Sequence, residues 1–249
     1  GDWRVRPWPC AEMQRNVKKA GQADGLAKRL DSRLGASATL RKQAVMSKRR
    51  KEDDSGILAA TMTSEEVGAL VGECVADATK GTTQSAPLKK LRQALCHQDE
   101  TIIGFALASG CIAALEKFLG MSSSPENQLE AAWCITNIAT GTTEQTGSVL
   151  HLAPTLIQLA AAEDSALQEQ CVWALGNLAG DTVEFCDTVT SNGAIPMLVR
   201  ALASPSVHVL RQAAWSLSNF VAKGPEHSKV KEVFNAGGGE ALCRLVLAP

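Results

Sequence analysis

Three Trp–Asn pairs recur along the chain, each with the Asn four residues after the Trp. The pairs are Trp133 with Asn137, Trp173 with Asn177, and Trp215 with Asn219. On a helix, positions i and i+4 lie on one face, one turn apart. An Asn carboxamide can donate to and accept from the backbone of any extended chain, and an indole face attracts a Lys or Arg cation by about 0.5–2 kcal/mol. The pairs therefore predict a surface that holds an extended, lysine-rich peptide.

A single pair of this kind would more simply be a core Trp and an Asn that is bonded within its own fold. The three pairs, however, are separated by 40 and 42 residues, and packing alone does not require both residue types at matching positions. Helices stacked about 8–10 Å apart would present one pair for roughly every two to three residues of an extended peptide. We expect the three indole rings to be accessible along the inner curve of such a stack.

The pairs lie within a repeat of about 40 residues. Its longer phrase reads EAAWCITNIAT at 130–140, EQCVWALGNLAG at 169–180 and RQAAWSLSNFVA at 211–222. Its shorter phrase begins with small residues and occupies 110–120, 153–160, 193–203 and 238–248. Such a period, with two or three helices per unit and Gly-rich turns, is typical of armadillo or HEAT solenoids. We predict an all-α armadillo solenoid over 57–249, a right-handed superhelix of about four repeats whose last repeat is incomplete.

Charge divides the chain into two parts. Residues 1–51 hold 14 Lys and Arg against 4 Asp and Glu, whereas residues 52–249 hold 11 against 22. The basic segment has little regular apolar pattern, so we predict that residues 1–56 form a largely disordered arm. The acidic body attracts cations, its own arm included.

Several functions are not supported by any motif. The eight Cys are at least fifteen residues apart and form no ligand-like spacing with the four His, so we expect no metal and no cofactor. No phosphate-binding glycine loop and no nucleophile phrase is present, and we therefore expect neither catalysis nor a small-molecule substrate. We also expect no membrane span or signal peptide, an intracellular location, and no nucleic-acid binding by the acidic body.

The phrases EAAWCITNIATGTTEQT, EQCVWALGNLAGD and WSLSN resemble the first armadillo repeats of the importin-alpha family of nuclear-import adaptors, over roughly residues 62–249. The resemblance implies a groove that binds Lys- and Arg-rich nuclear localisation signals. It implies that Trp133, Trp173 and Trp215 form lysine slots and that Asn137, Asn177 and Asn219 clamp the peptide backbone. It further implies a pocket for a critical lysine, formed by the Asp181 carboxylate, the Gly141 carbonyl and the Thr146 hydroxyl.

The basic arm is similar to the family's importin-beta-binding segment, although it is shorter and less basic. The residues that carry this similarity are Arg41, Lys42, Lys48, Arg49, Arg50 and Lys51. The resemblance implies that they bind importin-beta or occupy the chain's own groove as an autoinhibitor. A solvated basic tail, or a localisation signal in its own right, is the alternative.

The resemblance implies an adaptor that carries basic cargo between cytoplasm and nucleus. Because the sequence stops within a fourth or fifth repeat, we expect the distal half of the family's solenoid to be missing. With it would go the minor signal site and the export-receptor surface. Two alternatives stay open: an armadillo scaffold for another protein, and a relative that sequesters cargo without completing a transport cycle.

Overall fold

The computed structural model describes residues 62–96, 100–120, 122–223 and 228–247, and all regular elements in these ranges are helices. The arm residues 1–56, with the six basic positions predicted to bind importin-beta, lie outside the described residues. The helices are α3 (Ser64–Lys80), α4 (Ala86–Leu95), α5 (Glu100–Ala108), α6 (Cys111–Leu119), α7 (Pro125–Ile138), α8 (Thr143–Ser148), η1 (Leu150–Leu152), α9 (Ala153–Leu159), α10 (Ser165–Ala179), α11 (Val183–Ser191), α12 (Ala194–Ala201), α13 (Val207–Val221), α14 (Ser228–Asn235) and α15 (Gly238–Leu247).

The helices α4, α7, α10 and α13 begin at equivalent capping residues. The caps are Ser85, Ser124, Asp164 and Ser206, and each side chain accepts a hydrogen bond from a backbone N–H in the first turn. Such caps satisfy donors that a helix start leaves without a partner. In α7, α10 and α13 the Trp follows its cap by nine residues and the Asn by thirteen. The cap therefore gives each Trp–Asn pair the same position on its helix.

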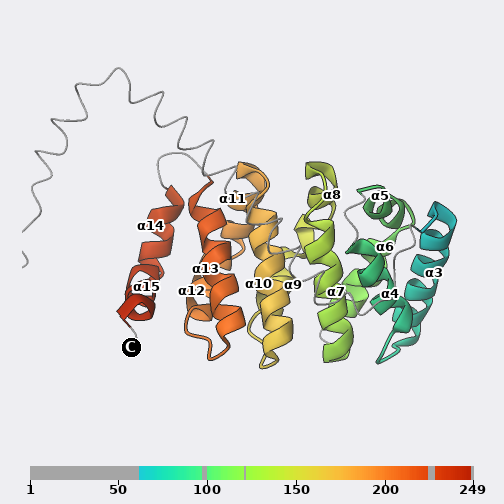
Figure 1. The fold of residues 1–249 in the computed structure, drawn as a ribbon, viewed down its shortest axis with the longest axis horizontal. Coiled ribbons are helices and arrows are strands. Elements are labelled where there is room, and N and C mark those ends of the chain that lie inside the picture. The colour runs from blue at the N-terminus through green and yellow to red at the C-terminus, as the bar shows by residue number, and fades with distance from the viewer. Residues whose placement is uncertain (1–61, 97–99, 121, 224–227, 248–249) are drawn as a thin grey trace, which may run out of the picture. The chain divides into compact units, whose positions relative to one another are not determined.

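These capped helices stack in chain order, α4 against α7, α7 against α10 and α10 against α13 (Figure 1). Shorter helices pack behind them, as α6 does against α7, α9 against α10 and α12 against α13. The predicted all-helical repeat of about 40 residues is thus confirmed for the described part of the chain.

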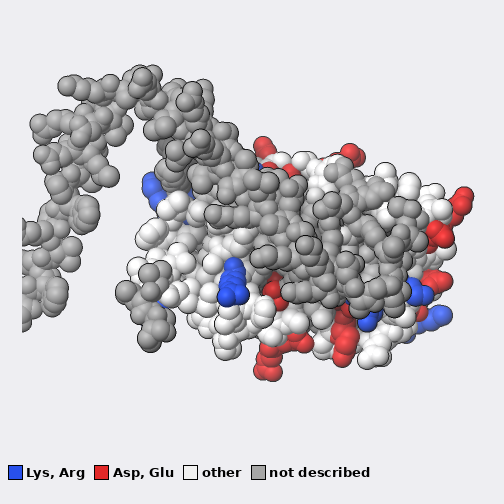
Figure 2. Space-filling model, in the orientation of Figure 1, with Lys and Arg blue, Asp and Glu red and all other residues white. Residues whose placement is uncertain are grey.

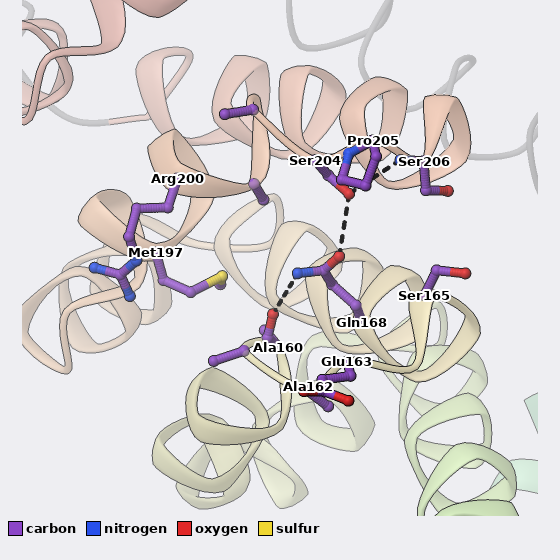
Figure 3. Close-up of a pocket in the computed structure, with 13 residues that line it drawn as sticks. Ala160, Ala162, Glu163, Ser165, Gln168, Met197, Arg200, Ser204, Pro205 and Ser206 are labelled. Atoms are coloured by element: carbon purple, nitrogen blue, oxygen red, sulfur yellow. Dashed lines mark hydrogen bonds between the residues drawn. The ribbon is translucent and has the colours of Figure 1, made fainter.

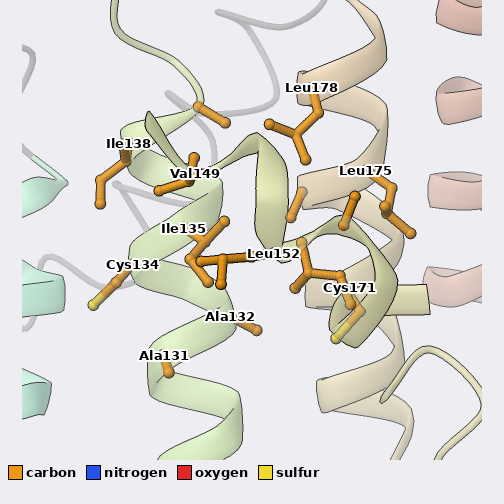
Figure 4. Close-up of a cluster of buried hydrophobic side chains, with 14 of the residues drawn as sticks. Ala131, Ala132, Cys134, Ile135, Ile138, Val149, Leu152, Cys171, Leu175 and Leu178 are labelled. Atoms are coloured by element: carbon orange, nitrogen blue, oxygen red, sulfur yellow. The ribbon is translucent and has the colours of Figure 1, made fainter. Parts of the chain in front are cut away.

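Small and branched apolar side chains fill the space between α7 and α10 (Figure 4). Ala132, Ile135 and Cys171 are fully buried there, together with Leu152 from η1 at 5% exposure. Ala and Cys keep the helix axes close, while Ile and Leu fill the remaining volume. The stack is therefore held mainly by apolar burial, and its polar positions are exceptions that need an explanation.

Three of the four shorter apolar phrases begin beside a glycine whose backbone takes a left-handed conformation. Gly110 precedes α6 with φ 80°, Gly193 precedes α12 with φ 89°, and Gly237 precedes α15 with φ 86°. A side chain at such a φ is strained, and glycine adopts it without that cost. The glycines at these three starts are therefore explained by the sharp corner between consecutive helices, whereas α9 begins after Leu152, whose φ is -81°.

Helices α5 and α6 form the most apolar pair of neighbours. Among the described residues, no single helix combines the length and the hydropathy needed to cross a membrane. The segments Thr101–Ala108 and Cys111–Leu119 pass that test only when taken together, with a bend of 81° between them. Ile102, Leu115 and Leu119 from this pair are buried in the hydrophobic core.

The seven described cysteines are free thiols, and five of them are buried: Cys74, Cys111, Cys134, Cys171 and Cys186. Burial raises the pKa of Cys74 and of Cys111 from 9.0 to about 12. Burial alone raises the pKa of Cys171 well above its ordinary value. Because the thiolate is the reactive form, these cysteines act as small apolar side chains in the folded protein.

We predict that the Cys171 thiol makes folding stability depend on alkaline pH. Its contribution is complete below the ordinary pKa of 9.0 and is lost as pH rises, because the unfolded chain then releases a proton that the folded chain keeps. The free energy of unfolding should fall by about 1.4 kcal/mol per pH unit for this thiol. Urea denaturation between pH 8 and 10.5 should show a shallower fall for Cys171→Ala than for the wild type. The exposed Cys243→Ala is the control, and equal slopes for all three proteins would contradict the prediction.

Candidate peptide-binding surface

The three Asn side chains are buried in the second halves of α7, α10 and α13, at 0%, 0% and 3% exposure. Each donates an Nδ2–H to a backbone carbonyl of the preceding capped helix. The pairs are Asn137 with Arg92 (3.4 Å), Asn177 with Thr136 (3.0 Å) and Asn219 with Gly176 (2.9 Å). This bond fixes which end of each carboxamide faces the scaffold, and it links every repeat to the one before it.

The other end of each carboxamide is left without a hydrogen bond. The Oδ1 atoms of Asn137, Asn177 and Asn219 are buried and have no partner among the described residues. An unsatisfied buried acceptor costs about 1–3 kcal/mol and is uncommon in native proteins. Three of them at matching positions of successive repeats form a regular row of acceptors, which a ligand's N–H groups could satisfy.

The three indole rings differ in exposure. Trp133 and Trp215 are half-buried, whereas Trp173 is only 1% exposed. Trp173 is therefore one of the largest fully buried side chains of the core. Its ring meets Trp215 edge to face, with 6.4 Å between centroids and 71° between planes, a favourable aromatic geometry. The expectation of three accessible rings is therefore wrong for Trp173, whose ring is buried.

A glycine sets how closely α10 and α13 approach beside these rings. A Cβ placed on Gly176 would lie 2.3 Å from Ser216 Oγ and 2.8 Å from the Trp215 ring. Ser216 Oγ in turn donates to the carbonyl of Val172 at 2.9 Å. Gly176 therefore brings Trp215 against α10 and also supplies the carbonyl that receives Asn219.

The residues predicted to form the critical-lysine pocket come from two neighbouring segments. Thr143 Oγ1 donates to Asp181 Oδ1 at 2.8 Å, which joins the start of α8 to the end of α10. Thr146, on the same short helix, is fully buried, and its Oγ1 has no partner in the described structure. Gly141 lies just before Thr142, the capping residue of α8. The structure thus links α8 to Asp181 through Thr143, which the sequence analysis did not single out.

Two cations of the chain itself lie near the candidate site, and both were missed. Lys223 Nζ donates to the backbone carbonyl of Asp181 at 2.8 Å. Arg92, at 4% exposure, lies over the Trp133 ring with its guanidinium carbon 4.2 Å from the ring centroid. Its Nε also donates to Glu130 Oε2 at 2.8 Å. No local sequence signal joins residues 40 positions apart, so only the fold could show these contacts.

A hollow of about 410 Å³ lies elsewhere, where α9 meets α10 and α12 meets α13 (Figure 3). Gln168 spans it, donating from Nε2 to the Ala160 carbonyl at 2.9 Å and accepting from Ser204 Oγ at 3.3 Å. Gln168 precedes Asn177 on α10 by about 13 Å of helix. The hollow includes none of the predicted site residues. Acidic side chains lie along the upper, right and lower edges of the described surface (Figure 2).

Known structures identify the fold. Residues 112–218 match a family model described as HEAT repeats. A designed armadillo repeat protein is similar with a TM-score of 0.59 and 23% identity, over 74% of this chain and 84% of that protein. A computationally designed armadillo repeat protein gives a TM-score of 0.55 and 21% identity, over 80% and 90%. At such identities the likeness shows the fold alone, and the fold is an armadillo solenoid.

Sequence relatives give the family within this class. Importin subunit alpha-2 of Arabidopsis thaliana is 30% identical over 239 residues, which cover 89% of this chain and 44% of the relative. Importin subunit alpha-9 of the same species is 37% identical over 162 residues, 64% of this chain and 31% of the relative. The chain belongs to the importin-alpha family, and it spans less than half the length of these relatives.

We predict that Gly176→Ala destabilises the protein by about 1–3 kcal/mol, because the added methyl must displace Ser216 and the Trp215 ring. The matched control is Gly72→Ala in α3, where a Cβ meets nothing within 4 Å. This control should be neutral or slightly stabilising, since alanine is the better helix former. Urea denaturation gives both free energies of unfolding. Equal effects of the two substitutions would show that close approach at Gly176 is unimportant.

Proposed function

We propose that this chain is an importin-alpha-type adaptor that binds extended Lys- and Arg-rich peptides, as nuclear localisation signals are, along the Trp–Asn surface. This surface is defined by Trp133, Asn137, Trp173, Asn177, Trp215 and Asn219, with Gly141, Thr146 and Asp181 beside it. The observation that carries the proposal is the row of three buried Asn oxygens without partners in the described structure. They sit beside indole rings at the same position of three successive repeats.

In the proposed complex the Asn row holds the peptide backbone. Each Nδ2 donates one N–H to the scaffold, and the Oδ1 without a partner is the atom that would accept a peptide N–H. An extended chain presents an N–H to the same side at every second residue, about 6.6 Å apart. Because these bonds involve only backbone atoms, they would hold any extended sequence, and selectivity must come from other groups.

Selectivity for basic side chains would come from the rings and the acidic groups. An indole face packs against the methylene stem of Lys or Arg and attracts its charged end. Asp181, which Thr143 orients through one carboxylate oxygen, would pair with one lysine. The Thr146 hydroxyl and the Gly141 carbonyl would accept the other hydrogens of the same ammonium group. Because Trp173 is 1% exposed, a ligand cation would contact its ring only after neighbouring side chains move.

The relatives and the fold support the general class of function in this proposal. The relatives are named importin subunits, and one designed armadillo protein was solved in complex with the peptide (KR)4. Proteins of this fold can therefore hold an alternating Lys–Arg peptide. Because the chain spans less than half of its relatives, nuclear import, cargo binding and residence in both cytoplasm and nucleus are all parts of the proposal.

The basic arm has two proposed roles. Arg41, Lys42, Lys48, Arg49, Arg50 and Lys51 would bind importin-beta, or would compete with cargo for the Trp–Asn surface. Opposite charges on arm and body favour the second contact at low ionic strength. Replacing Arg49, Arg50 and Lys51 by Gln separates the roles. Competition requires tighter cargo binding by this variant, whereas importin-beta binding alone leaves cargo affinity unchanged.

We predict that the full chain binds a fluorescent Lys-rich peptide at micromolar concentration or tighter, as measured by anisotropy. Asn177→Ala should weaken binding about tenfold, because one backbone hydrogen bond is lost in a buried site. Trp173→Ala should weaken it by a similar factor through the lost cation–π contact. Asn192→Ala, at the exposed end of α11, is the control and should not change the affinity. Peptide binding that ignores Asn177 and Trp173 would favour the scaffold alternative.

A further inference from the structure

The Trp133 ring already has a cation on one of its faces. The Arg92 guanidinium lies 4.2 Å from the ring centroid, and its Nε bonds to Glu130 at 2.8 Å. Arg92 is 4% exposed although it carries a full charge, so its ring and carboxylate partners offset the loss of water. An indole face together with a carboxylate is the environment that the candidate surface would offer to a basic ligand side chain.

The register of the repeats explains why an arginine sits there. The Trp follows its capping residue by nine positions in three helices, and the ninth position after Ser85 is Ala94. Because alanine has no aromatic ring, α4 provides no ring to pack against Trp133, and Ala94 itself is buried at 1% exposure. Further along the row, Trp173 has Trp215 as its neighbour. Arg92, two residues before Ala94, takes the corresponding place at the α4 end.

We propose that Arg92 ends the row of indole slots by acting as a resident cation on Trp133. It covers one ring face and neutralises Glu130, so a lysine of the ligand finds neither a free face nor a free carboxylate at the α4 end. Ligand cations are thereby confined to the slots that border Trp173 and Trp215, and the peptide register is fixed. This inference rests on the proposed function and adds Arg92 as a residue that determines specificity.

The alternative is that Arg92 is only a structural brace between α4 and α7. The two roles predict opposite results when the charge is removed. If Arg92 is only a brace, removing its charge leaves peptide binding unchanged or makes it weaker. A resident cation that is lost frees the Trp133 face and the Glu130 carboxylate, and it removes a like charge. Binding of a cationic peptide should then become tighter, and only through the lysine that reaches Trp133.

The test is a lysine-to-alanine scan of one Lys-rich peptide against four full-length proteins, with dissociation constants from anisotropy. The proteins are the wild type, Arg92→Gln, Arg200→Gln, and Arg92→Gln combined with Trp133→Ala. Arg200 is an exposed residue of α12, so Arg200→Gln controls for the change in net charge. Thermal unfolding confirms that each variant is folded, and Arg92→Met, which keeps the apolar stem, replaces Arg92→Gln if that variant unfolds.

We expect Arg92→Gln to bind the parent peptide about three- to tenfold more tightly than Arg200→Gln does. Replacing one terminal lysine of the peptide by alanine should change the affinity of the wild type less than about twofold. The same replacement should weaken binding to Arg92→Gln clearly, and this effect should disappear in the variant that also carries Trp133→Ala. If the wild type binds the peptide but Arg92→Gln and Arg200→Gln give the same lysine scan, the inference on Arg92 is wrong and the proposed function stands. If no protein binds the peptide, the proposed function fails and the inference fails with it.

Discussion

The hydrogen bond from each Asn carboxamide to the carbonyl of the preceding helix is the constraint on which the candidate surface depends. Asn177 and Asn219 make it at 3.0 and 2.9 Å in buried positions, where an amide without a partner would cost about 1–3 kcal/mol. The bond joins neighbouring repeats, and every Oδ1 is left buried without a hydrogen-bond partner among the described residues. One polar group thus sets the spacing of the stack and the direction of its remaining acceptors.

Apolar packing makes that arrangement possible. Ala132 and Cys171 keep α7 and α10 close, and Gly176 lets α13 come near enough for Asn219 to reach its carbonyl. Larger side chains there would separate the helices and break the bond. Trp133 and Trp215 then lie half-buried on α7 and α13, whereas Trp173 is buried on α10. Stability and the candidate binding surface therefore depend on the same close contacts between helices.

The repeat and its helices could be predicted from the sequence because their signals are local. The expected helix at 86–96 is α4, Ala86–Leu95, and the Ser and Asp residues before the long helices are their caps. The use of Asn137 and Asn177 on a ligand stays a prediction, and the structure adds a bond from one donor of each to the preceding repeat. That choice depends on a carbonyl about 40 residues away, which no local pattern encodes. The contact of Arg92 with Trp133 and the burial of Trp173 could not be predicted for the same reason. The roles of the predicted site residues in binding stay predictions.

The central claim is that the Asn oxygens accept hydrogen bonds from the backbone of an extended ligand. It is tested most directly with Lys-rich peptides in which one amide at a time is replaced by an ester, because the ester removes one N–H and keeps the side chains. Every second ester, on the side that faces the Asn row, should weaken binding to the wild type about tenfold. The ester that faces Asn177 should cause no further loss in Asn177→Ala. Ester effects that are uniform along the peptide, or that persist unchanged in Asn177→Ala, would contradict the account.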